Sequence, residues 1–200
     1  CSACSRVLVE APVAAELQAR LVEATRALKV GDPLQRENWM GPVINEASRA
    51  NYLRAVGELR RDGEILVGGD VPAGLDAGHF VLPTFASVAH GHGLWSEELF
   101  LPLALVGEVA DLDEAIARAN ASDFGLTAGF YGAESEIPGF LSRIEAGVTY
   151  VNRPQGATTG AWPGYQPFGG WKGSGSTGKA IGSFYYLPQY LREQSRTVVE

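Results

Sequence analysis

The sequence predicts an α/β fold with an open, mainly parallel sheet that is covered by helices. Short runs rich in β-branched residues alternate with segments of helical periodicity, and loops containing glycine or proline separate them. Such alternation is typical of parallel sheets, because each return to the same end of the sheet uses a helix. The 200 residues are enough for one hydrophobic core or two small domains.

The spacing of apolar residues, together with the residues that interrupt helices and strands, predicts most of the secondary-structure elements. Helices are expected where apolar residues recur every three or four positions, at 14–28, 45–63, 111–120 and 135–147. Strands are expected at 6–10, 64–69, 79–88, 102–109, 126–132 and 148–152. Pro83 favours an edge position for the 79–88 strand. Asn45 is a candidate helix cap, and Asp111 with Glu114 forms a capping-box pattern.

The alternation stops after residue 152, in a segment rich in glycine and interrupted by prolines. A loop of this length inside a compact domain is usually either functional or disordered. Four aromatic residues, which disordered linkers seldom carry, lie within it: Trp162, Tyr165, Phe168 and Trp171. We therefore expect a folded loop that faces a ligand.

The composition argues against two classes of partner, nucleic acids and membranes. The chain has 16 basic and 23 acidic residues, a net charge of −7, and no run of Lys or Arg that could neutralise phosphates. Nucleic acid is therefore not an expected partner. The apolar runs are much shorter than the ~20 residues of a membrane helix, so no membrane association is expected. The cysteine content and the lack of a recognisable secretory signal favour the cytoplasm.

Cys1 and Cys4 form a C-x-x-C pair that allows four interpretations. Zinc would need two further ligands, which His90 and His92 could supply, although their H-x-H spacing fits a solvated turn better. A redox pair would be expected at the start of a helix, whereas these cysteines precede a strand. Cys1 could also be the nucleophile of a hydrolase that its own α-amine activates. The fourth interpretation is two small residues without a role.

Further motifs occur in a fixed order along the chain. They are CSACSR at 1–6, MGPVI at 40–44, VLPT at 81–84, WSEELFLP at 95–102, AN at 119–120, FGLTAG at 124–129 and QPFGGWKGSG at 166–175. Together they resemble the C-terminal portion of the NAD(P)-dependent aldehyde dehydrogenase superfamily over essentially the whole chain. The resemblance implies that Cys1, five residues before Arg6, is the nucleophile, and that Cys4 takes no part.

A narrower resemblance concerns the substrate. Ser after the nucleophile, and Thr-Gly-Ala shortly before Gln-Pro-Phe-Gly-Gly, resemble the 1-pyrroline-5-carboxylate dehydrogenases, whose substrate is L-glutamate γ-semialdehyde. The resemblance implies that Ser2, Gly160 and Ala161 hold the substrate α-carboxylate, a role that backbone N–H groups and a hydroxyl suit. A second candidate for this loop is the QGA at 155–157. Phe168 is expected to pack against the aliphatic part of the aldehyde.

The cofactor site is implied only in part. Glu98 and Phe100 lie where the family holds the nicotinamide riboside of NAD or NADP, and a carboxylate can accept hydrogen bonds from ribose hydroxyls. Leu101 departs from the family, which has Gly at this position. In the family, most of the cofactor site, the oxyanion-stabilising Asn and the general-base Glu precede the nucleophile. None of them is present in this sequence.

The expected reaction is covalent: the Cys1 thiolate attacks the aldehyde, hydride leaves for the nicotinamide, and the thioester is hydrolysed to glutamate. Residues 1–193 then resemble a catalytic domain that begins at its nucleophile, which we expect to fold but not to oxidise aldehydes alone. Residues 194–200 are expected to be an oligomerisation strand that pairs with a second copy. The alternatives are another carboxylated semialdehyde as substrate and a non-catalytic assembly module.

Overall fold

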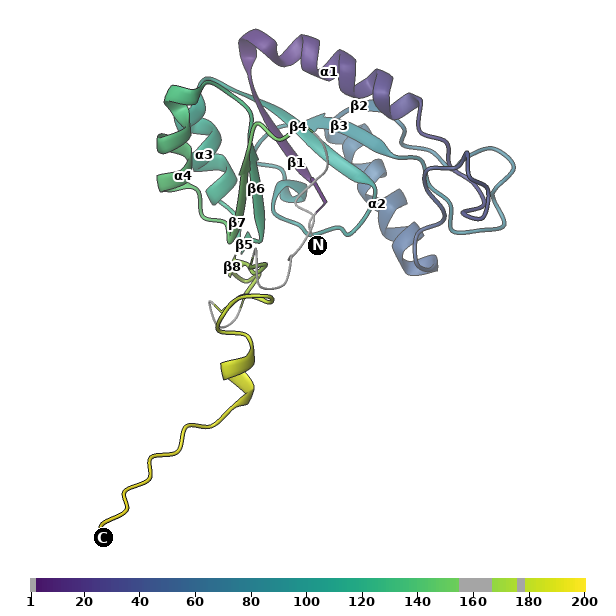
Figure 1. Ribbon diagram of the computed structural model, residues 1–200. Coiled ribbons are helices and arrows are strands. Elements are labelled where there is room, and N and C mark those ends of the chain that lie inside the picture. Colours follow the sequence, from purple (N-terminus) through teal and green to yellow (C-terminus); the bar gives the residue numbers. More distant parts are fainter. Residues whose placement is uncertain (1–2, 155–166, 176–178) are drawn as a thin grey trace. The chain divides into compact units, whose positions relative to one another are not determined.

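The computed structural model describes residues 3–154, 167–175 and 179–200, which form two compact units (Figure 1). The N-terminal unit comprises Cys4–Arg118, and the C-terminal unit consists mainly of Ala119–Glu200. No helix among the described residues is both long and apolar enough to cross a bilayer.

The N-terminal unit is built on a four-stranded sheet. Its strands, in spatial order, are β1 (Arg6–Glu10), β4 (Leu103–Val109), β3 (Thr84–Val88) and β2 (Gly63–Val67). β4 is parallel to both β1 and β3, whereas β2 is antiparallel to β3. The helices α1 (Ala11–Arg26) and α2 (Glu46–Asp62) cover opposite faces of this sheet (Figure 1). The predicted helix-covered, mainly parallel sheet is therefore confirmed here.

Alternation along the strands divides the core between the two helices. On the face of α1, Val9 and Val106 pack with Ala14. The residues next to them in the strands point the other way, so Leu105 joins a larger cluster on the face of α2. That cluster also contains Tyr52, Ala55, Val56, Leu59, Val81, Ala86, Val88, Leu94, Trp95 and Leu103. The period of two seen in the sequence thus places one apolar layer on each side of the sheet.

The prediction that β3 lies at a sheet edge is wrong. β3 begins at Thr84, after Pro83, and it is an inner strand between β4 and β2. Pro83 lies outside the hydrogen-bonded ladder, so its missing N–H does not weaken the sheet. The edge position belongs instead to β2, which the sequence also marked as a strand.

Two helix starts were predicted from capping residues. The Asn45 side chain accepts a hydrogen bond from the Ser48 backbone N–H at 2.9 Å, which confirms it as the cap of α2. Before α3 (Leu112–Asn120), the Asp111 carboxylate accepts from the Glu114 N–H at 2.9 Å. The return bond of this capping box differs from the prediction, because Glu114 accepts from the N–H of Ala110 at 2.7 Å.

The C-terminal unit has two small sheets. β5 (Phe124–Gly125) pairs antiparallel with β8 (Trp171–Lys172), and β6 (Thr127–Phe130) pairs parallel with β7 (Val148–Val151). The pairing of β5 with β8 joins two short strands that were not among those expected from the sequence. Residues 194–200 are exposed and belong to no strand within the described part of the chain, so their pairing with a second copy stays a prediction.

The helix predicted at 135–147 is shorter than expected. A 3₁₀ turn (Glu134–Glu136) leads into α4 (Ile137–Arg143), and the chain is extended from Ile144. Ile144 and Ala146 are both buried, which extended backbone allows because their side chains are two positions apart. The helix therefore ends at Arg143, four residues before the predicted end at Gly147, and the burial of Ile144 and Ala146 accompanies the change to extended backbone.

Candidate functional site

The N-terminal unit carries two of the predicted site residues on one segment, Ser96–Leu101. This segment follows a 3₁₀ turn (Gly93–Trp95) whose start is capped by the His92 ring, which accepts from the Leu94 N–H at 3.2 Å. Trp95 is buried, and its ring N–H donates to the Val88 carbonyl at 3.3 Å. The turn therefore fixes where the segment leaves the core.

From Glu98 to Leu101, side chains of this segment alternate between solvent and the edge of the core. Leu99 and Leu101 pack against the α2-side core, whereas Glu98 is exposed and the Phe100 side chain is 72% exposed. Phe100 also has a φ of 56°, in the left-handed region that non-glycine residues rarely adopt. Leu101 fills space in the core, which gives a physical reason for a large residue where the family has Gly.

Glu98 and Phe100 together fit the cofactor contact that the sequence implies. Within the described residues, the Glu98 carboxylate has no hydrogen-bond or ion-pair partner, so its oxygens are available to ribose hydroxyls. The Phe100 ring offers an apolar face two residues away. An exposed aromatic held in a strained backbone conformation is the kind of outlier that occurs at ligand sites.

Phe168 lies in the C-terminal unit, where a backbone bridge holds it. Its N–H donates to the Ile181 carbonyl at 2.9 Å, and the Ile181 N–H donates back at 3.0 Å. The backbone around Phe168 packs so closely that two positions have room only for glycine. A Cβ on Gly147 would overlap the Gly169 carbonyl, and a Cβ on Gly175 would overlap the Gly170 carbonyl. The described part of the glycine-rich segment is therefore tightly folded, and Phe168 is half-buried in it.

Lys172 ties this segment to the rest of the C-terminal unit. Its ammonium group donates to the carbonyls of Asn120, at 2.6 Å, and Ser122, at 3.1 Å, and it forms an ion pair with Glu145. This lysine, which no motif singled out for a role, holds β8 beside β5.

The remaining predicted substrate and catalytic residues lie outside the described residues. These are Cys1, Ser2, Gly160 and Ala161, together with the alternative loop 155–157. Of the predicted set, the structure brings together Glu98 and Phe100, and it places Phe168 in the other unit.

Cys4 and the two histidines have ordinary partners within the fold. The Cys4 thiol donates to the Arg6 carbonyl at 3.6 Å. The residue is exposed overall, yet desolvation of the thiol raises the pKa of Cys4, against the lowering effects of the backbone and the charge of Arg6. The His90 ring nitrogen hydrogen-bonds the Glu108 carbonyl at 2.8 Å, and His92 pairs with Asp62. Among the described residues, no cluster of His, Cys, Asp and Glu could hold a metal ion.

Comparison with known proteins identifies the class. A family model described as the aldehyde dehydrogenase family matches residues 1–195, and the chain therefore belongs to this family. The chain is 35% identical, over 203 residues, to a 1-pyrroline-5-carboxylate dehydrogenase of Geobacillus sp. strain WCH70, an alignment that covers 100% of this chain and 38% of that protein. It is also 38% identical, over 180 residues, to a betaine aldehyde dehydrogenase of Brucella anthropi, which covers 88% of this chain and 36% of that one.

Solved structures give the same result for the fold. A Thermus 1-pyrroline-5-carboxylate dehydrogenase with bound NAD superposes with a TM-score of 0.87 at 31% identity, over 96% of this chain and 36% of that one. Proline utilization A from Bdellovibrio bacteriovorus gives a TM-score of 0.86 at 33% identity, over 95% of this chain and 19% of that chain. The predicted family and its 1-pyrroline-5-carboxylate dehydrogenase branch are thus supported, for a chain that spans 38% of the length of a curated relative.

Proposed function

We propose that this chain is the catalytic portion of an NAD(P)-dependent aldehyde dehydrogenase that oxidises L-glutamate γ-semialdehyde to L-glutamate. The observation that carries the proposal is the similarity to 1-pyrroline-5-carboxylate dehydrogenases across the full 200 residues, from Cys1 to the end. The exposed Glu98 and Phe100 support it, because their setting suits the cofactor contact that the family motif implies.

Cys1 is the reacting group in this proposal. Its thiolate forms a bond to the aldehyde carbon, and the carbonyl electron pair moves onto the oxygen. When bound, the nicotinamide cofactor supplies the hydride acceptor that converts this adduct to a thioester. Water then adds to the thioester carbon and the Cys1 thiolate leaves, so the aldehyde becomes a carboxylic acid. A free thiol titrates near ~8.5, so the site has to favour the anion.

Glu98 and Phe100 are the residues of this chain that would hold the cofactor. The Glu98 carboxylate would accept hydrogen bonds from ribose hydroxyls, and the Phe100 ring would pack on the riboside. The rest of the dinucleotide is bound by residues beyond this chain, so the choice between NAD and NADP is made elsewhere.

Charge separates the two substrates that the relatives suggest. Betaine aldehyde carries a quaternary ammonium group, which is recognised by aromatic cages, whereas the semialdehyde carries an α-carboxylate. Ser2, Gly160 and Ala161 provide a hydroxyl and backbone N–H groups, which suit the carboxylate. The similarity to betaine aldehyde dehydrogenases keeps the cationic aldehyde as the second candidate.

The test is substrate oxidation by a chimera in which the Geobacillus relative supplies the residues that precede the nucleophile. We expect reduction of NAD or NADP with the semialdehyde, at a kcat/KM well above that for betaine aldehyde, and no turnover by the Cys1→Ser variant. The 200-residue chain alone is expected to be inactive. A folded chimera that prefers betaine aldehyde would contradict the proposed substrate, and one that retains activity after Cys1→Ser would contradict the mechanism.

A further inference from the structure

Arg54 makes three hydrogen bonds that lead from α2 to the segment carrying Glu98. On its own helix, Nε donates to Asn51 Oδ1 at 2.9 Å and Nη1 donates to Glu58 Oε1 at 2.7 Å. Nη2 then donates to Glu97 Oε1 at 2.5 Å, a contact between residues 43 positions apart. Two neighbours on α2 therefore hold the guanidinium in the orientation in which it binds Glu97, and the planar fork of Arg suits this arrangement.

Glu97 directly precedes the alternating part of the segment. It is an exposed residue that the ion pair with Arg54 ties to α2, whereas Leu99 and Leu101 are held by apolar packing against the core. Glu98 and Phe100 are the exposed positions next to these leucines. A rotation of the segment that brought the Glu98 carboxylate toward the core would remove Leu99 and Leu101 from their apolar packing, so the outward direction of Glu98 depends on how its neighbours are held.

We propose that Arg54 is a positioning residue that acts through Glu97. It holds the segment Ser96–Leu101 against α2 in one orientation, and so keeps Glu98 and Phe100 directed outward. The leucines anchor the C-terminal part of the segment, and the His92 cap anchors the turn before it. The Arg54–Glu97 ion pair anchors the residue that lies between the turn and the leucines. The link from this geometry to cofactor binding rests on the proposed function.

The expected strength of the Arg54–Glu97 ion pair distinguishes a positioning role from a role in the stability of the whole fold. The side chains of Arg54 and Glu97 are each 41% exposed, and partly exposed pairs typically change an equilibrium by a factor of about 1.5 to 5. An effect of this size is small for the fold as a whole. It is large enough to change how often a short loop occupies one conformation.

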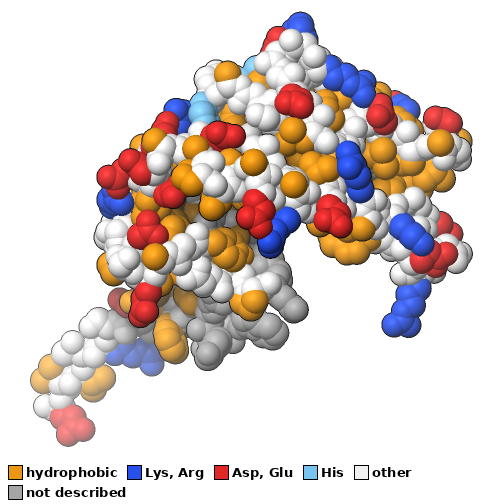
Figure 2. All heavy atoms as spheres, turned by 90° about the horizontal axis from the view of Figure 1, so that it is seen from above, with side chains coloured by type: hydrophobic (Ala, Val, Ile, Leu, Met, Phe, Trp, Pro, Cys, Tyr) orange, Lys and Arg blue, Asp and Glu red, His pale blue; other side chains and the backbone are white. Residues whose placement is uncertain are grey.

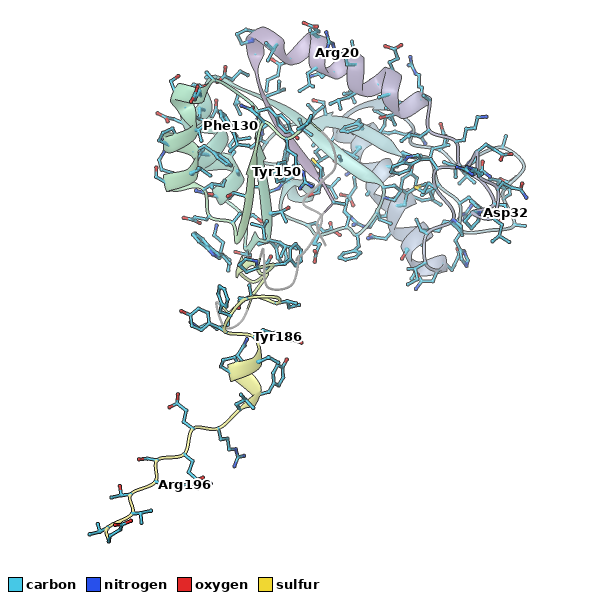
Figure 3. All side chains as sticks on the ribbon, viewed as in Figure 1. Arg20, Asp32, Phe130, Tyr150, Tyr186 and Arg196 are labelled. Atoms are coloured by element: carbon cyan, nitrogen blue, oxygen red, sulfur yellow. The ribbon has the colours of Figure 1, made fainter. Side chains whose placement is uncertain are left out.

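The first experiment measures backbone order by NMR relaxation in the 200-residue chain without ligand. In Arg54→Ala and Glu97→Ala, we expect order parameters at 97–101 to fall from the rigid range of about 0.85 toward about 0.6, while α2 and β4 stay rigid. Arg54→Lys, which keeps the charge but not the fork, is expected to restore part of the order. Arg20→Ala, which removes the ion pair with Glu16 on α1, is the matched control and is expected to change nothing at 97–101 (Figure 3).

Unchanged order at 97–101 in both alanine variants would overturn the inference. So would a loss of order spread over the whole N-terminal unit, since that is the result of a merely structural role. The second experiment uses the chimera described above, in which Arg54→Ala is expected to raise the KM for NAD about threefold with kcat unchanged. An active chimera with an unchanged KM contradicts the positioning role alone. An inactive wild-type chimera contradicts the proposed function, and the order parameters still decide the role of Arg54.

Discussion

At the scale of single residues, Phe100 combines backbone strain with an exposed side chain. A left-handed conformation costs a non-glycine residue about 1–2 kcal/mol, and the 72% exposed ring recovers little of this by burial. We predict that Phe100→Gly stabilises the chain by about 1 kcal/mol in chemical denaturation, because Gly adopts this conformation freely. In the chimera, the same variant is expected to raise the KM for NAD.

A matched control tests the origin of this gain. Phe184 is 91% exposed and is not among the described residues with positive φ, so Phe184→Gly is expected to give no stabilisation. Equal stabilisation by both variants would show that loss of an exposed ring, rather than relief of strain, is the cause.

The thiol of Cys4 should be a slow nucleophile. Since desolvation raises its pKa, less thiolate is present at neutral pH than in a free cysteine. We predict that alkylation of Cys4 by iodoacetamide, followed by mass spectrometry of the folded chain, is slower than that of the same residue in urea. The rate should begin to rise only at a more alkaline pH in the folded chain. Equal rates in the folded and unfolded chains would contradict the raised pKa.

Tyr52 is the centre of a buried polar cluster that joins α2 to the loop before β3. Its hydroxyl donates to the Leu82 carbonyl at 2.7 Å, accepts from the Gly69 N–H at 3.1 Å, and lies 2.7 Å from Thr84 Oγ1. We predict that Tyr52→Phe lowers the free energy of unfolding by about 1–2 kcal/mol, measured by urea denaturation. Thr84 still bonds both other groups, which keeps the loss moderate.

The same hydroxyl gives this prediction a pH dependence. Burial raises the pKa of Tyr52, so the folded chain holds the proton more tightly than the unfolded chain. The stabilisation is complete below the unfolded value of ~10 and is lost as the pH rises above it. Tyr52→Phe should remove this part of the alkaline loss, and an unchanged alkaline profile would argue against the assignment.

At the scale of elements, two glycines make opposite predictions. A Cβ on Gly147 would overlap the Gly169 carbonyl, so Gly147→Ala should displace the segment that bears Phe168 and destabilise the C-terminal unit by about 2–3 kcal/mol. Gly57, exposed within α2, has no atom within 4 Å of an added Cβ. Gly57→Ala should therefore stabilise the chain by about 0.5–1 kcal/mol through helix propensity. Thermal unfolding that shifts both variants in the same direction would contradict the packing argument.

Elements with a clear local signal were predictable from the sequence. The period of α1 and α2, the Asn45 cap and the β-branched runs of β1 and β4 all agree with the structure. Strand order was not predictable, because it depends on which strands pair across the fold, and the interpretation of Pro83 failed for that reason. The end of α4 also depends on tertiary burial, here of Ile144, rather than on the local sequence.

The residues of the candidate site also differ in whether the local sequence could predict them. Glu98 and Phe100 were predicted from the motif around them; the structure adds their exposure and the backbone conformation of Phe100, and their contact with the cofactor stays a prediction. Arg54 had no signal in the sequence, because its role depends on a contact between residues 43 positions apart. Residues that act through long-range contacts need coordinates to be recognised.

At the scale of the whole molecule, the sequence is acidic and its basic side chains are not gathered together on the face that Figure 2 shows. Figure 2 shows Lys and Arg side chains dispersed among acidic ones on the face that is viewed, and the net charge is −7. A basic patch that could follow a phosphate backbone is not seen on that face.

The last prediction concerns self-association through residues 194–200. Val198 and Val199 are 86% and 88% exposed, and an exposed β-branched segment that belongs to no strand among the described residues is available to pair with a strand edge of a second copy. We predict that the double variant Val198→Lys, Val199→Lys shifts the chain toward monomer in sedimentation velocity. The charges would lie in the new interface, where they cost solvation energy. Val13→Lys, at a 54% exposed valine on α1, is the matched control and should leave the distribution unchanged. If the unmodified chain sediments as a monomer at all concentrations, this segment has no role in assembly of the chain by itself.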